Sequence, residues 1–135
     1  MIKFLKKEEI IMIDEVGTIK QKLSELMEKD KTVESLVVVS KDGLPISSTL
    51  PLEEEEKTAA VSASLIMLGE KAIEDFKRGT LEEIITRGTE GYIIIVSLNQ
   101  SSALLAVLNK EAKLGLIRLE LKALSKSIMD ILGGF

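Results

Sequence analysis

The chain has 135 residues, of which 30% are charged, and 18 Lys and Arg against 22 Asp and Glu give a formal net charge of -4. This length and balance predict one globular domain with a substantial apolar core. The negative charge, together with the lack of basic stretches interleaved with aromatic residues, argues against nucleic acid as a partner.

The N-terminal stretch MIKFLKKEEIIMI mixes apolar and charged residues. Its longest apolar run, Ile10 to Ile13, is too short for a signal sequence or a membrane-spanning helix. We therefore expect a cytoplasmic protein without direct membrane insertion. We also expect residues 1–12 to form a flexible extension and residues 13–135 to form a single domain.

The first predicted helix runs from Asp14 to Glu28, because apolar residues recur there at three- and four-residue steps. The next segment predicts a β-hairpin. Its first strand is the β-branched run from Ser35 to Ser40, and its second is the run from Leu44 to Leu50. The Asp42-Gly43 pair between them has the chemistry of a hairpin turn.

The second predicted helix runs from Glu53 to Arg78, between Pro51 and Gly79. Four consecutive glutamates begin it, where the helix dipole favours negative charge. A helical projection places one apolar group on a side that we expect to pack on the sheet: Val61, Leu65, Leu68, Ala72, Ile73 and Phe76.

The earlier half of this helix is apolar on its opposite side as well. The residues there are Ala59, Ala60, Ala63 and Met67. A helix without a polar face is normally covered on both sides, and small side chains let a second helix approach closely. We predict a contact with the same helix of a second copy of the chain. Two alternatives stay open: cover by the first or third helix of the same subunit, or alanines placed only for their helix propensity.

Three strands joined by short links follow, which predicts an antiparallel meander. They run from Leu81 to Arg87, from Tyr92 to Leu98 and from Ala103 to Leu108. A strongly amphipathic helix then extends from Leu114 to Ile131. The order is α-β-β-α-β-β-β-α, so the predicted class is α+β, with helices flanking a five-stranded antiparallel sheet.

The first of these three strands has a composition that suits a sheet edge, since Leu81, Ile84 and Ile85 lie among charged residues. An unpaired edge can accept a further strand. Two interpretations stay open. The strand pairs with its symmetry mate and continues the sheet across a dimer, or its charges protect an edge that faces solvent.

The chain lacks the usual apparatus of catalysis, because it contains neither cysteine nor histidine. There is no phosphate-binding P-loop and no GxGxxG motif. The glutamates from Glu53 to Glu56 fan outwards from a helical turn and cannot converge on one ion. We predict no catalytic residue, no cofactor and no metal site, and we interpret Arg78, Arg87 and Arg118 as exposed structural residues.

Three stretches in the expected order resemble the roadblock/dynein light chain family: VESLVVVSKDGLPIS, LGEKAIEDFKRGTLEEIITR and KLGLIRLELK. The resemblance implies a profilin- or longin-like roadblock fold that dimerises through its second helix and third strand. Carried over by position, the dimer interface consists of Ala59, Ala60, Ala63, Met67, Leu81, Ile84 and Ile85.

The resemblance also implies a function. Family members regulate or scaffold Ras-like small GTPases or serve as accessory light chains of motor complexes, and this chain is most similar to the prokaryotic members. We expect a non-catalytic homodimeric module that binds a Ras-like small GTPase as an activator or a tether. The alternative is a structural light chain or scaffold subunit of a larger motor or membrane-associated complex. Because no arginine finger is evident, activation would act through the GTPase's own switch loops.

Overall fold

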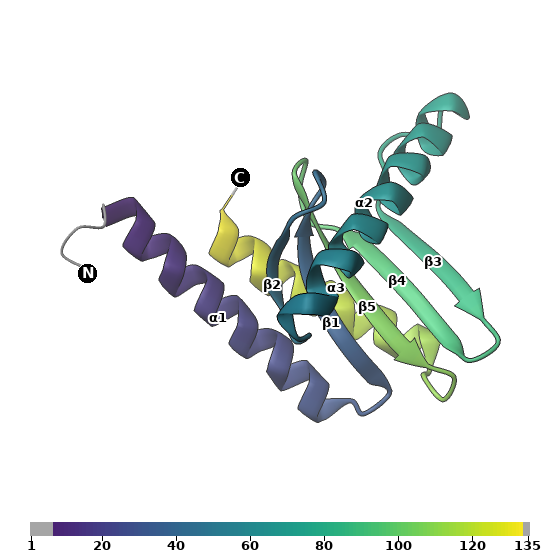
Figure 1. Ribbon diagram of the computed structural model, residues 1–135. Coiled ribbons are helices and arrows are strands. Elements are labelled where there is room, and N and C mark those ends of the chain that lie inside the picture. The colour runs from purple at the N-terminus through teal and green to yellow at the C-terminus, as the bar shows by residue number, and fades with distance from the viewer. Residues whose placement is uncertain (1–6, 134–135) are drawn as a thin grey trace.

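The computed structural model describes residues 7–133, with side chains from Glu15 onward (Figure 1). Its helices are α1 (Lys7–Lys29), α2 (Leu52–Asp75) and α3 (Leu114–Leu132). Its strands are β1 (Val33–Ser40), β2 (Pro45–Ser48), β3 (Glu83–Gly88), β4 (Gly91–Ser97) and β5 (Ser102–Asn109). They form one antiparallel sheet in the order β2-β1-β5-β4-β3, which confirms the predicted fold class.

Helix α1 begins at Lys7, earlier than the predicted start at Asp14. Residues 7–12 are therefore helical, whereas residues 1–6 of the predicted extension lie outside the described residues. The division into an extension of residues 1–12 and a domain of residues 13–135 remains a prediction. Along the described part of the chain, no helix is long and apolar enough to cross a membrane.

Helices lie on both faces of the sheet. Helices α1 and α3 pack together over one face, and α2 crosses the other (Figure 1). In β1, Leu36 and Val38 point into the α1/α3 layer, whereas Val37 and Val39 point towards α2. A strand buried on both faces needs apolar residues at every position, which explains why β1 reads as a continuous apolar run.

Helix α2 meets the sheet through a stripe that includes its smallest residues. The stripe repeats at three- and four-residue steps: Ala59, Ser62, Ile66, Gly69 and Ile73. Ser62 is fully buried, and its hydroxyl still has a hydrogen-bond partner, because it donates to the Thr58 carbonyl oxygen at 2.7 Å. A Cβ added to Gly69 would lie 2.9 Å from Ile84 Cδ1, so glycine lets the helix lie close to β3.

The predicted sheet-facing side of α2 was therefore only partly right: Leu65 and Ile73 pack against the layer beneath the helix, but the other four residues do not. Leu68 and Phe76 are 67% and 75% exposed, and Val61 and Ala72 are exposed as well. Helix α2 carries two neighbouring apolar stripes. The stripe with the smaller side chains allows the helix to approach the sheet more closely, and the stripe with the larger side chains remains on the surface.

The end of α2 also differs from the prediction, since the helix stops at Asp75 rather than at Arg78. Lys77 adopts a left-handed conformation with φ 56°. The Arg78 and Lys77 N–H groups donate to the carbonyl oxygens of Ile73 and Glu74, at 2.9 and 3.0 Å. This pattern is a Schellman cap in which a lysine takes the position that usually belongs to glycine.

The two edges of the sheet differ. Strand β2 has only four residues and begins with Pro45, and its pairing with β1 shifts register between Val38 and Val39. Strand β3, at the other edge, pairs with β4 in an unbroken register from Glu83 to Gly88. Proline and irregular pairing discourage strand addition at an edge, whereas a regular edge leaves its outer hydrogen-bonding groups available.

Two carboxyl groups meet where α3 passes the link between α1 and β1. The Thr32 hydroxyl donates to Asp30 Oδ1 at 2.6 Å, and this bond is the main reason why the pKa of Asp30 lies below its usual range. Partial burial, followed by repulsion from Asp30, raises the pKa of Glu120. The folded state therefore resists ionisation of Glu120.

We expect Glu120→Gln to stabilise the protein by about 0.5 kcal/mol at neutral pH, a modest figure because solvent screens this partly exposed pair. A raised folded-state pKa favours folding below the unfolded pKa, and this contribution is lost as pH rises through the folded pKa. The gain should therefore fade towards acidic pH in urea unfolding curves. Glu34→Gln, which makes the same charge change at an exposed position of β1, is the control. Equal effects of both substitutions would contradict the assignment.

Candidate functional site

A row of apolar side chains runs along the side of α2 that does not face the sheet. Its members follow each other at three- and four-residue steps, and we refer to them as the α2 flank: Val61, Leu65, Leu68, Ala72 and Phe76. Only Leu65 is partly covered, since it packs against the buried layer beneath α2. An exposed contiguous apolar row on a globular domain is typical of an interaction surface.

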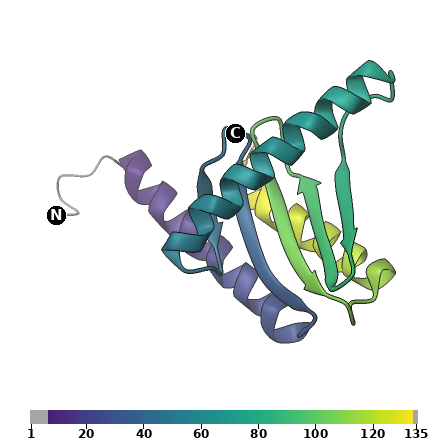
Figure 2. The same cartoon turned by 45° about the vertical axis from the view of Figure 1, so that its right-hand side comes forward.

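The sheet beside the α2 flank is open. Helix α2 crosses the sheet diagonally and leaves the parts of β3, β4 and β5 near the β3–β4 turn without a helix above them (Figure 2). Three side chains on this face are only partly buried and pack against the same cluster as Leu65: Ile93 and Val107 in the open part, and Ile84 at its border, against Gly69 of α2. We refer to them as the open sheet face. The α2 flank and the open sheet face thus border one apolar cluster.

The β3 edge completes this surface. Strand β3 pairs with β4 on one side only, so the backbone groups of its other side are unpaired within the described residues. Ile85 pairs with Ile94, whose side chain belongs to the α1/α3 layer, so Ile85 points to the face opposite α2. The edge therefore carries apolar residues towards both faces of the sheet.

The structure does not gather the seven predicted interface residues on one surface. Ala59 is 0% exposed because it lies on the face of α2 that packs against its own sheet, and Leu81 is buried too. Ala60 and Ala63 lie beside the β1–β2 turn, where a Cβ on Gly43 would be 3.5 Å from Ala63 Cβ. The small residues there accommodate a turn of the same chain.

The remaining three predicted residues are accessible but diverge. Met67 is 68% exposed on α2, Ile84 contributes to the open sheet face, and Ile85 lies on the opposite face of β3. The sequence interpretation missed Val61, Leu65 and Leu68 as surface residues, although it recognised their spacing, because it assigned that stripe to the sheet. It also missed Ile93 and Val107.

The charged groups near this surface do not form a catalytic arrangement. Arg118 forms an ion pair with Glu83, and Arg87 lies over the ring of Tyr92, 5.9 Å from its centroid. Arg78 lies just beyond the end of α2, where its guanidinium bonds to the Lys77 carbonyl oxygen at 3.4 Å. Among the described residues, no three acidic side chains converge to hold a metal ion.

Comparison with known proteins places these features in a family. The sequence profile of the Roadblock/LC7 domain matches residues 19–109. The chain belongs to the Roadblock/LC7 domain family. Two uncharacterized proteins of Methanocaldococcus jannaschii are each 30% identical to it over 106 residues, which cover 76% of this chain and 92% of each relative.

Solved structures have the same Roadblock/LC7 fold. A Roadblock/LC7 domain from Streptomyces avermitilis has a TM-score of 0.80 at 23% identity, covering 84% of this chain and 96% of that one. MglB of Myxococcus xanthus has a TM-score of 0.79 at 18% identity, covering 87% and 89%. The gliding protein MglB of Thermus thermophilus has a TM-score of 0.77 at 14% identity, covering 87% and 90%.

The match to the Roadblock/LC7 domain covers one part of the molecule and leaves out α3. Residues 19–109 include α2, the open sheet face and the β3 edge, so the apolar surface lies entirely within the family's common part. Helix α3 follows the matched region, although it completes the core on the other face of the sheet.

Proposed function

We propose that this Roadblock/LC7 protein is a non-catalytic homodimeric adaptor that binds a Ras-like small GTPase. The observation that carries the proposal is the combination of the α2 flank, the open sheet face and the β3 edge in one apolar surface. A surface of this kind suits assembly with another protein rather than the conversion of a small substrate.

In the proposed dimer, two α2 helices lie side by side and the two β3 edges pair. A twofold axis needs only one self-complementary patch, and an antiparallel pair of identical strands satisfies that symmetry. We move the helical part of the predicted interface from Ala59, Ala60 and Ala63 to the α2 flank, because Ala59 is buried against its own sheet and Ala60 and Ala63 lie beside the β1–β2 turn. Ile84 stays in the interface, now together with Ile93 and Val107.

The GTPase part of the proposal rests on family membership. Roadblock-type proteins act as a class through binding, and regulation of small GTPases is the role that the sequence resemblance implies. Arg87 and Arg118 each interact with a side chain of their own subunit, which argues against either one serving as an arginine finger. The adaptor would instead bias the nucleotide state by binding one conformation of the GTPase switch loops more tightly.

The test uses the full-length protein and the Ras-like GTPases of its own genome, each loaded with GDP or with a non-hydrolysable GTP analogue. We expect nucleotide-dependent binding and a change in hydrolysis or exchange rate of about tenfold, which is within the usual range of coupling between sites. The matched control is a Leu68→Glu variant that is shown to be folded. Failure of every cognate GTPase to bind in either nucleotide state, with unchanged rates, would refute the proposal, and co-purification with a large assembly lacking any GTPase would favour a scaffold subunit instead.

A further inference from the structure

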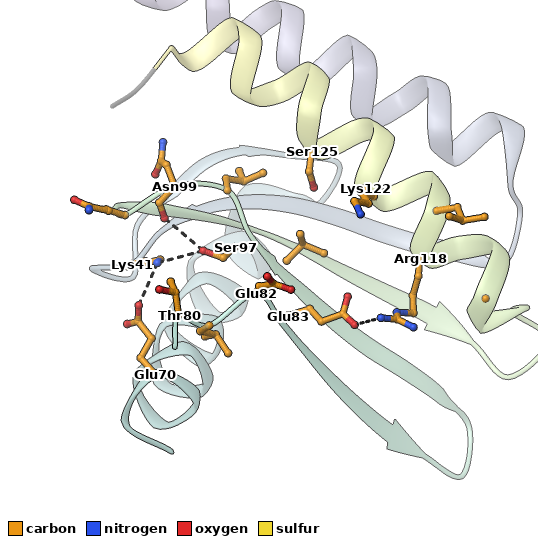
Figure 3. Close-up of a pocket in the computed structure, with 16 residues that line it drawn as sticks. Lys41, Glu70, Thr80, Glu82, Glu83, Ser97, Asn99, Arg118, Lys122 and Ser125 are labelled. Carbon is orange, nitrogen blue, oxygen red and sulfur yellow. Dashed lines mark hydrogen bonds and ion pairs between the residues drawn. The ribbon is translucent and has the colours of Figure 1, made fainter. Parts of the chain in front are cut away.

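A cleft separate from the apolar surface opens between α3, the segment entering β3 and the β4–β5 turn (Figure 3). Its volume is about 810 Å³, within the range that holds small organic ligands. Five residues on one side of α3 form one wall: Gly115, Arg118, Leu119, Lys122 and Ser125. Leu81, Val96 and Leu98 supply apolar surface.

A buried hydroxyl group faces this cleft. Ser125 is 8% exposed, and its Oγ has no hydrogen-bond partner within the described part of the chain. Figure 3 shows the hydroxyl pointing from α3 towards the sheet. A buried polar group that is left unpaired is costly, so a polar ligand group that pairs with Ser125 Oγ recovers this loss on binding.

A second unpaired group comes from the β4–β5 turn. Asn99 Oδ1 accepts hydrogen bonds from the Ser101 N–H at 2.9 Å and from the Ser102 hydroxyl at 2.8 Å. Because a backbone N–H can only donate, these bonds fix which end of the amide is the oxygen. Asn99 Nδ2 is therefore a defined donor, and it is buried without a partner among the described residues.

The charges around the cleft leave one cation and one anion unpaired. Arg118 is paired with Glu83, and Lys41 Nζ lies 3.2 Å from Glu70 Oε2. Lys122 on the α3 wall and Glu82 on the opposite side have no ion pair with any other described residue. The cleft thus offers a positive group and a hydroxyl from α3 and a carboxylate from the segment before β3, whereas Asn99 lies at its far end (Figure 3).

We propose that this cleft binds a small zwitterionic ligand with an aliphatic body, either an apolar amino acid or a short peptide with free ends. The ligand carboxylate pairs with Lys122 and accepts a hydrogen bond from Ser125. The ligand ammonium group pairs with Glu82, and the aliphatic part lies against Val96 and Leu98. The cleft lies within one subunit, so this binding does not depend on the dimer or on a GTPase.

The proposal can be tested by titrating the full-length protein with leucine and with leucyl-leucine, followed by NMR and calorimetry. We expect saturable binding of at least one of them with a Kd below about 1 mM. Whichever of the two binds more tightly shows whether the cleft prefers a free amino acid or a peptide. Leucine amide and N-acetyl-leucine each lack one charge, and we expect about tenfold weaker binding for both. No saturable binding, or equal binding of the blocked analogues, would overturn the proposal.

One variant and its control test the cleft itself. Ser125→Ala should weaken binding about tenfold while raising the thermal midpoint, since it removes a hydroxyl that has no partner among the described residues. Ser127→Ala, on the same helix but outside the cleft, is the control. A lower midpoint with unchanged affinity in Ser125→Ala would show a merely structural hydroxyl and refute the assignment.

Discussion

A Gly91→Ala variant is expected to lose about 3 kcal/mol or more of its unfolding free energy. Gly91 begins β4 with φ 154°, a backbone conformation that side chains rarely adopt. An added Cβ would lie 2.0 Å from the Leu108 carbonyl oxygen, which belongs to the backbone of the adjacent strand β5. That oxygen cannot move aside without breaking the pairing of β4 with β5, which joins the two halves of the sheet.

Urea denaturation of the variant and wild-type proteins measures this loss. Gly17→Ala is the matched control, because Gly17 lies in α1 and an added Cβ meets nothing within 4 Å. That substitution should stabilise the helix by about 0.5–1 kcal/mol. If Gly91→Ala unfolded at the wild-type urea concentration, the close approach of β4 and β5 would be wrong.

A Leu68→Glu variant is expected to be a folded monomer under conditions where the wild-type protein is a dimer. Leu68 is 67% exposed in the single subunit, so a glutamate there meets water and leaves the fold intact. In the proposed dimer it would bury a charge without a partner. We expect the dimer to weaken about 100-fold, as measured by sedimentation equilibrium.

The control for this experiment is Leu116→Glu, which makes the same substitution at a leucine of α3 that is 52% exposed and lies outside the α2 flank. The control should remain dimeric, and circular dichroism should show the same helix content for both variants. A wild-type protein that stays monomeric at high concentration would contradict the proposed assembly. So would a Leu116→Glu variant that dissociates as readily as Leu68→Glu.

The fold class was predictable because each element is encoded locally. Apolar residues of α3 repeat with the helical period, and Asp42-Gly43 marks the hairpin turn, so order and type follow from short windows of sequence. The orientation of α2 was not predictable in this way. Its two apolar stripes, one built on Ala59 and one on Leu68, both have helical spacing, and only the distance between helix and sheet decides which is buried.

The surface features depend on contacts that no single window contains. Ala63 looked free to meet a second subunit because the turn at Gly43, which approaches it, lies far away in the sequence. The cleft likewise combines Lys41, Asn99 and Ser125 from three separate segments. Hydrophobic patterning identifies which residues are apolar. Neighbours from distant segments decide which apolar side chains stay exposed and which polar groups stay unpaired.

The contrast between the two sheet edges limits how far self-assembly can proceed. If two β3 strands pair as proposed, the outer borders of the combined sheet are both β2, a short strand that begins with Pro45 and pairs irregularly with β1. Neither border is a good template for another chain. In the proposed dimer, the β2 borders would therefore prevent growth into fibrils, and the combined sheet would end at ten strands.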